Sequence, residues 1–255
     1  MKYRTDWLTV LKPQREATLR LFCFPYAGGG STIFRQWAPY LPETIELYAV
    51  QFPGRESRMR EPALTDLCTL VEELARAIMP FLDRPYAFFG HSMGALVAFE
   101  LARRLSDERG PAPIHLLLSG RSAPQLPITD RAIYNLPEPE FIEEVRHLNG
   151  TPGEVLAHPD LKHIVLPLLR ADFAVCQTYR YEPAPPLQCR ITALGGLQDE
   201  WTTRESLDAW REQTSSTFNL RMFPGNHFFI EQSLTQLLRI IEHELTNTRH
   251  YAMRS

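Results

Sequence analysis

The chain has 255 residues, of which 44% are hydrophobic, and a formal net charge of −3. This composition excludes a disordered, collagen-like or coiled-coil protein, and so small a net charge offers no general attraction to nucleic acid. At about 100–200 residues per domain the length allows one large domain or two small ones. The order of elements described next favours a single domain over residues 1–255.

Short apolar runs alternate with amphipathic stretches along the chain, a pattern typical of strands that alternate with helices. Such alternation predicts an α/β fold with a mostly parallel central sheet flanked by helices. The expected strands lie at residues 19–25, 45–52, 85–90, 114–119, 190–194 and 219–223. The expected helices lie at residues 31–41, 64–82, 95–104, 204–211 and 232–245.

The alternation is interrupted at residues 124–181, a segment with little strand character. Three helices are expected there, at residues 138–148, 152–157 and 161–179, and Pro167 should kink or split the last of them. The segment could be a pair of ordinary crossover helices. Because connections between elements are usually a few residues long, we interpret it instead as a helical lid insertion within the single domain, called the insertion below.

The strongest chemical signal lies between the third expected strand and the helix that follows it. The sequence there reads Gly90-His-Ser-Met-Gly-Ala, a G-x-S-x-G motif in the strand–turn–helix context of the α/β-hydrolase fold. A sharp turn should push the Ser92 hydroxyl out of the sheet in a strained conformation, with the glycines leaving room for it. Ser92 is therefore the predicted nucleophile, and the side chain of His91 is expected to point elsewhere.

A serine hydroxyl needs a base, and in this fold the acid and the histidine follow the serine along the chain. His227 lies just after the last expected strand and is the predicted general base. Asp199 follows the fifth expected strand and is the predicted acid that orients this imidazole. Its neighbour Glu200 is the competing carboxylate, whereas the loop after the fourth expected strand holds none.

An oxyanion hole needs two backbone N–H groups, one of which should come from Met93, directly after the nucleophile. The other should come from the glycine-rich loop Phe24-Pro-Tyr-Ala-Gly-Gly-Gly-Ser, where Ala27 is the first candidate and Tyr26 the second. A dinucleotide-binding loop would need a third glycine where Ile33 stands, so that pattern fails. The sequence also contains no HExxH motif, and we expect neither a metal site nor a cofactor site.

Five segments together are similar to one enzyme family. They are Phe24-Pro-Tyr-Ala-Gly-Gly, Gln51-Phe-Pro-Gly-Arg-Glu-Ser-Arg, Gly90-His-Ser-Met-Gly-Ala, Leu169-Arg-Ala-Asp-Phe and Gly225-Asn-His-Phe-Phe. On these segments the chain resembles, over nearly its full length, the type II thioesterases of polyketide and nonribosomal peptide synthesis. That family commonly reads Gly-Asp-x-Asp around its acid. This chain reads Gly196-Leu-Gln-Asp, so the first Asp is replaced while the matching acid, Asp199, is kept.

The resemblance implies hydrolysis of acyl groups from the phosphopantetheine arm of acyl or peptidyl carrier domains, which clears stalled or misloaded chains through an acyl-serine intermediate. It implies no cofactor beyond the phosphopantetheine that the substrate carries. Carrier domains are typically acidic, so docking would need a local basic patch. The candidate basic residues are Arg55, Arg58, Arg60, Arg121, Arg146, Lys162 and Arg170.

Three alternatives remain open at this point. A general carboxylesterase or other acyl hydrolase would use the same three side chains, and an acyltransferase would pass the acyl group to an alcohol or amine. A non-catalytic carrier-binding protein on the same fold is the third alternative. The predicted set of Ser92, Asp199 and His227 argues against it.

The sequence also indicates the cell compartment and the partners of the protein. The four cysteines include no CxxC pair, the first twenty residues contain no long apolar stretch, and no run approaches the length of a membrane span. We therefore expect a cytoplasmic monomer whose partners are carrier domains rather than nucleic acid or a membrane.

Overall fold

The computed structural model describes residues 5–127, 131–151 and 153–252. Residues 128–130 and Pro152, which belong to the expected insertion, lie outside the described residues. No helix in the described part of the chain combines the length and the apolar character needed to cross a bilayer.

A seven-stranded sheet forms the centre of the molecule, in the order β1-β3-β2-β4-β5-β6-β7. All pairings are parallel except that of β1 with β3, so the expected mostly parallel sheet is confirmed. The strands are β1 (Leu8–Lys12), β2 (Leu19–Phe24), β3 (Ile45–Val50), β4 (Tyr86–His91), β5 (His115–Ser119), β6 (Arg190–Gly196) and β7 (Phe218–Phe223).

The edge strand β1 was not predicted from the sequence. Its five residues are all only partly buried, because β1 pairs on one side alone. The central strands are different, since every residue of β2 and β4 is buried. Their side chains alternate between two apolar clusters on opposite faces of the sheet: Phe22 and Phe88 belong to one cluster, Leu21 and Phe89 to the other.

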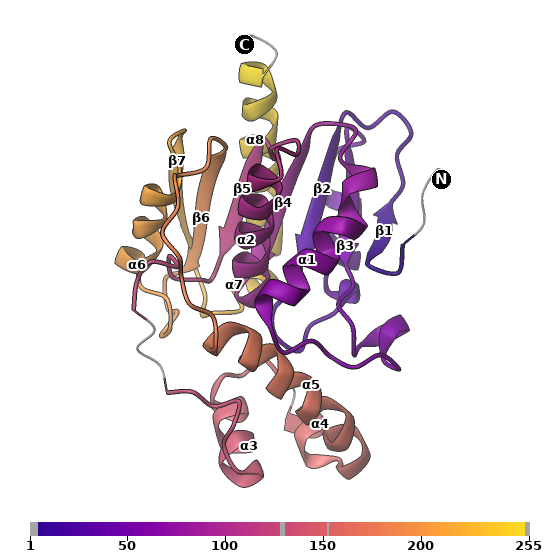
Figure 1. Ribbon diagram of the computed structural model, residues 1–255, viewed down its shortest axis with the longest axis vertical. Helices are drawn as coiled ribbons and strands as arrows, with labels where there is room; N and C mark the ends of the chain where they lie inside the picture. The colour runs from indigo at the N-terminus through magenta and orange to yellow at the C-terminus, as the bar shows by residue number, and fades with distance from the viewer. Residues whose placement is uncertain (1–4, 128–130, 152, 253–255) are drawn as a thin grey trace.

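Helices cover both faces of the sheet. In Figure 1, α1 and α2 lie in front of the strands and α8 lies behind them, and the two apolar clusters divide in the same way. The helical elements around the sheet are η1 (Ser31–Tyr40), η2 (Glu56–Arg58), α1 (Leu67–Ile78), η3 (Met79–Phe81), α2 (Met93–Asp107), α6 (Arg204–Asp208), η4 (Ala209–Gln213), α7 (Phe229–Gln232) and α8 (Leu234–Ala252).

Two helical boundaries differ from expectation for identifiable reasons. Helix α1 begins later than expected because the Asp66 side chain accepts a hydrogen bond from the Thr69 N–H at 2.8 Å and caps it. Element η1 was expected as an α-helix but is a 3₁₀ helix that contains Pro39. The residue before it, Gly30, has no side chain that could cap it. The carboxylate of a distant residue, described below, satisfies its first N–H groups instead.

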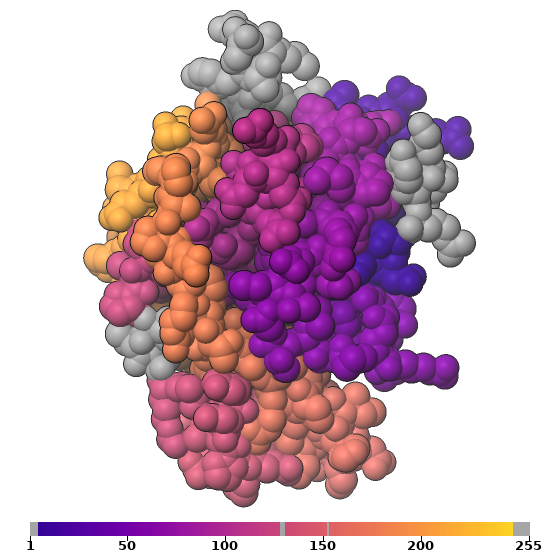
Figure 2. All heavy atoms as spheres, in the orientation of Figure 1, coloured from indigo at the N-terminus to yellow at the C-terminus, as the bar shows by residue number. Residues whose placement is uncertain are grey.

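Between β5 and β6 the chain forms α3 (Glu138–His147), α4 (Gly153–Ala157) and α5 (Pro159–Gln177). Pro167 was expected to kink or split this helix; α5 is continuous through it, so the split is wrong. Pro167 lies on the exposed side of the helix, where water can bond the carbonyl oxygen that a proline leaves free. These three helices gather at the lower end of the molecule in Figure 1, form a separate lobe in Figure 2, and bury a small apolar cluster of their own.

Candidate active site

The turn between β4 and α2 holds Ser92 in an unusual backbone conformation, with φ 54° and ψ −112°. A side chain at Gly90 would lie 2.1 Å from the Gly94 carbonyl oxygen, and one at Gly94 would lie 2.1 Å from the Phe24 carbonyl oxygen. The turn is therefore too tight for any residue but glycine at these two positions. The strained conformation expected of Ser92 is confirmed, at a typical cost of about 1–3 kcal/mol.

His227 and Asp199 meet across the loops after β7 and β6. The His227 Nδ1 atom lies 2.8 Å from Asp199 Oδ2, and the Asp199 side chain is fully buried. The other carboxylate oxygen accepts the backbone N–H groups of Trp201 at 2.9 Å and Thr202 at 3.2 Å. Burial alone would raise the pKa of Asp199, but the hydrogen bonds and the nearby imidazole lower it below its usual value, so the carboxylate stays ionised. The competing carboxylate of Glu200 is exposed.

The side chain of His91 does not simply point away from the site. Its ring is fully buried, and its centre lies 5.0 Å from the centre of the His227 ring. His91 Nδ1 lies 2.9 Å from Ser119 Oγ, which fixes the ring beneath His227. Burial, and then the proximity of His227, hold the pKa of His91 well below its usual value, so His91 is a neutral neighbour of the predicted base.

Ser92 and His227 line a single cavity of about 390 Å³. Its walls combine loops that follow β2, β4, β5, β6 and β7 with side chains from α3 and α5. The carboxyl ends of parallel strands meet at one edge of a sheet, which explains why residues far apart in the sequence gather there. The insertion supplies a largely apolar wall that includes Val145, Leu169 and Phe173. The arrangement offers a hydroxyl, an imidazole and a carboxylate beside space for an apolar chain.

Ala27 and Tyr26, the candidates for the second oxyanion donor, also line the cavity. Among the described residues no protein group accepts a hydrogen bond from the backbone N–H of Ala27 or Met93, so both are available to a ligand. The next residue, Gly28, has φ +79° and donates its N–H at 2.7 Å to the carboxylate of Asp172, on α5. The roles of Ala27 and Met93 stay predictions.

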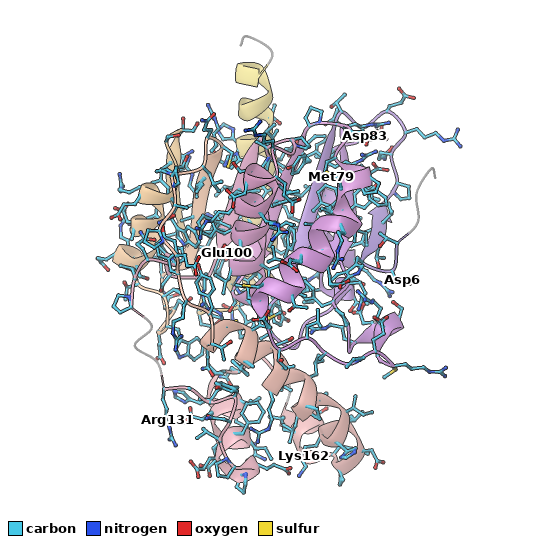
Figure 3. All side chains as sticks on the ribbon, in the orientation of Figure 1. Asp6, Met79, Asp83, Glu100, Arg131 and Lys162 are labelled. Carbon is cyan, nitrogen blue, oxygen red and sulfur yellow. The ribbon has the colours of Figure 1, made fainter. Side chains whose placement is uncertain are left out.

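The structure excludes two of the basic residues suggested for docking. Arg55 and Arg58 are only 6% and 7% exposed, and both bind carboxylates of this chain, those of Asp172 and Glu61. They are therefore unsuited to contact a partner. Arg60 and Arg146 are exposed, and Lys162 lies at the far end of the insertion, as Figure 3 shows, in an ion pair with Glu138.

Sequence reasoning missed several residues of the site. Trp201 packs edge-on against the His227 ring at 5.3 Å between ring centres, although it lies only two residues from the predicted acid. Arg55 was suggested only for docking, and Asp172 was noted within a motif without a role. The signal for Asp172 was a carboxylate between the apolar residues Ala171 and Phe173 of a helix, which in a buried position requires a partner.

Known proteins resemble this chain in sequence. The family model for the thioesterase domain matches residues 19–245. Gramicidin S biosynthesis protein GrsT of Aneurinibacillus migulanus is 46% identical over 235 residues, which cover 92% of this chain and 92% of that protein. Linear gramicidin dehydrogenase LgrE of Brevibacillus parabrevis is 48% identical over 242 residues, which cover 94% of this chain and 92% of that protein.

Solved structures resemble the chain as well. YbtT, described as a type II thioesterase from the yersiniabactin nonribosomal peptide and polyketide pathway, superposes with a TM-score of 0.86 at 31% identity. The match covers 95% of this chain and 99% of that one, so it includes the sheet and the insertion alike.

Proposed function

Because the chain belongs to the thioesterase domain family, we propose that it removes acyl groups from the phosphopantetheine arm of carrier domains. The chain is a thioester hydrolase of the type II thioesterase kind, and it has the α/β-hydrolase fold, as the sequence predicted. The proposal concerns the form of the substrate and the role of each side chain in the reaction.

One observation carries the proposal: Ser92, His227 and Ala27 border one cavity with an apolar wall, and Asp199 holds His227 from behind it. A thioester needs a nucleophile, a base and a site for the negative oxygen, and its acyl chain needs an apolar wall. The strand ends supply the first three, and the insertion supplies the wall.

The proposed reaction has two steps. Ser92 Oγ attacks the thioester carbonyl carbon while His227 takes the hydroxyl proton, and Asp199 holds the imidazole in the required orientation. The Met93 and Ala27 N–H groups bind the oxyanion, and the carbon–sulfur bond then breaks. The thiolate leaves with the proton from His227, and the acyl group stays on Ser92. A water molecule, deprotonated by His227, then cleaves the acyl-serine ester and returns the free hydroxyl.

The carrier domain is proposed from the relatives. The gramicidin S protein and the yersiniabactin thioesterase are named for pathways of nonribosomal peptide or polyketide synthesis, in which the growing chain is held on carrier domains. The remaining basic candidates for docking are Arg60, Arg121, Arg146, Lys162 and Arg170. Of these, Arg121 lines the cavity itself.

One relative is named a dehydrogenase, but this chain does not carry the dinucleotide fingerprint in its glycine-rich loop. The glycine-rich loop has Ile33 where a dinucleotide fingerprint needs its third glycine. Gly28 and Gly29 are occupied instead with contacts to α5 and to Tyr26, as their hydrogen bonds show.

The test compares release of one acyl group from a carrier domain, from a free pantetheine thioester and from an aryl ester. Ser92→Ala serves as the blank for each substrate. Asp199→Asn is the variant in which part of the activity should remain. We expect the highest kcat/KM with the carrier-bound thioester, loss of turnover in Ser92→Ala, and about a 10³–10⁴-fold lower kcat in Asp199→Asn.

Other outcomes identify the alternatives. Equal kcat/KM for all three substrates would indicate a general acyl hydrolase, and transfer to an added alcohol in place of hydrolysis would indicate an acyltransferase. Full turnover by Ser92→Ala would remove the proposed mechanism altogether.

A further inference from the structure

Two of the motifs noted in the sequence contain three charged residues that the proposed mechanism does not use. They are Arg55 and Glu56 in Phe52-Pro-Gly-Arg-Glu, and Asp172 in Leu169-Arg-Ala-Asp-Phe. All three bind the glycine-rich loop, the segment that presents the Ala27 N–H to the cavity. Motifs separated by more than a hundred residues in the sequence therefore meet at one turn of the backbone.

The contact between Arg55 and Asp172 is a buried two-point ion pair. Arg55 Nη1 lies 2.9 Å from Asp172 Oδ2, Arg55 Nη2 lies 2.7 Å from Oδ1, and Asp172 is only 2% exposed. Each partner also holds the loop: Asp172 Oδ2 accepts the Gly28 N–H at 2.7 Å, and Arg55 donates to the Gly29 carbonyl oxygen at 2.9 Å. The pair thus holds the N–H of the Ala27–Gly28 peptide and the carbonyl oxygen of the Gly29–Gly30 peptide.

Glu56 holds the other end of the same loop. Its carboxylate accepts the backbone N–H groups of Ser31 and Thr32, both at 3.1 Å, and their hydroxyls, both at 2.6 Å. Glu56 adopts φ +47° to do so, a conformation uncommon for a residue with a side chain. Burial opposes its ionisation, but these hydrogen bonds lower the pKa of Glu56 below the usual value, so the carboxylate stays charged.

Ala27 lies between β2 and these two sets of contacts, which fix the direction of its backbone. Gly28 has φ +79°, and a side chain there would lie 2.7 Å from Leu169 Cδ2 on α5. Helix α5 therefore rests directly on the loop at Gly28, next to Ala27. A buried ion pair contributes little net stability, since the desolvation of both charges offsets their attraction. The pair matters here for geometry, because the bond from the Gly28 N–H to Asp172 fixes the Ala27–Gly28 peptide plane, directly after the predicted oxyanion donor.

We propose that Arg55 and Asp172 are positioning residues, which orient the Ala27 N–H toward the oxyanion by holding the Gly28 N–H and the Gly29 carbonyl oxygen against helix α5. The inference rests on the proposed oxyanion role of Ala27 and adds the means by which that role is set. Neither side chain touches the substrate. The inner part of the insertion, on this view, is a fixed component of the oxyanion hole as well as a wall of the acyl cavity.

The test uses Asp172→Asn and Arg55→Lys with a free pantetheine thioester, so that carrier docking does not enter the result. The asparagine loses the charge and one acceptor, and the lysine cannot bond both carboxylate oxygens and the Gly29 carbonyl together. We expect kcat to fall about 10–100-fold in each variant with KM little changed, since a donor displaced from the oxyanion acts mainly in the transition state.

A second readout separates positioning from folding. A trifluoromethyl ketone that adds to Ser92 forms a tetrahedral oxyanion, so its affinity should fall in parallel with kcat/KM. The double variant should be no slower than the slower single variant, because the pair acts as a unit. Glu138→Gln, which breaks the exposed Lys162–Glu138 pair of the same insertion, is the matched control and should leave kcat and ketone affinity unchanged.

Two results would overturn the inference. In the first, the variants keep wild-type kcat and ketone affinity and lose only melting temperature, as a purely structural pair would. In the second, KM rises at unchanged kcat, as damage to the acyl cavity would cause. Either result leaves the proposed function intact, because that depends on the preference of the wild-type enzyme for the carrier-bound thioester.

Discussion

Gly120 illustrates how single residues without chemistry of their own control the site. It has φ +58°, and a side chain there would lie 2.6 Å from His91 Cε1 and 3.2 Å from His227 Cε1. The imidazole of the predicted base thus has no free space on this side. The proposed triad residues follow motifs and chain order, but the need for glycine at this position arises from its positive φ and from the packing of two rings.

We expect Gly120→Ala to lower kcat/KM about 10–100-fold, because the new methyl group must displace His91 or His227 from its position. The measurement is steady-state hydrolysis of a soluble thioester, with the melting temperature recorded alongside. Gly153→Ala is the control, since a side chain there meets nothing within 4 Å. Wild-type kcat/KM in Gly120→Ala would show that the rings can move aside without effect.

At the scale of elements, the two ends of the insertion are held differently. In the second half of α5, Val175 and Cys176 belong to the main apolar cluster, and Asp172 pairs with Arg55. Helices α3 and α4 pack mainly on the smaller cluster of the insertion itself, and exposed ion pairs such as Arg131–Glu140 add little to their stability. Figure 3 places Arg131 and Lys162 on this outer part.

Hydrogen exchange should therefore divide the insertion in two. We expect backbone amides of α3 and α4 to exchange at least about tenfold faster than those of residues 168–176, because local opening is easiest where few apolar contacts join the rest of the fold. Exchange measured by mass spectrometry at neutral pH tests this. Protection of α3 and α4 equal to that of α2 would indicate a uniformly rigid insertion.

For the whole molecule, buried neutral histidines link stability to pH. His115 is completely buried and lies 2.8 Å from Thr192 Oγ1, and burial, helped by Arg190, lowers its pKa to about 3. In the unfolded chain the same side chain has a pKa near ~6.5. Below that pH the unfolded state binds a proton that the folded state excludes, so the free energy of unfolding falls as the pH falls.

We expect His115 to contribute about 1.4 kcal/mol of lost stability between pH 7.5 and 5.5. His115→Gln, which can keep the hydrogen bond to Thr192, should reduce the difference between these two pH values by that amount. Urea unfolding at each pH measures it. The lowered pKa values of Asp199 and Glu56 affect stability only at lower pH, so they do not interfere. An unchanged difference in the variant would mean that His115 is protonated in the folded state.

The sequence by itself determined the α/β architecture, the turn around Ser92, and the candidates His227 and Asp199. Hydrophobic period, turn glycines and chain order are local properties, and they can be read without knowing which segments meet. Element boundaries were less certain. The half-buried edge strand β1 gave too weak a pattern to be predicted, and Pro167 gave a local signal that its exposed position made harmless.

Only the tertiary structure decided which charges face solvent and which face each other. Arg55 and Arg58 were plausible docking residues in the sequence, yet folding buries both against carboxylates. Asp172, the glycine-rich loop and the ring of His91 come together because parallel strands end at one edge of the sheet and α5 closes over it. The pairing of Arg55 with Asp172 depends on this long-range packing, which leaves no local pattern in the chain.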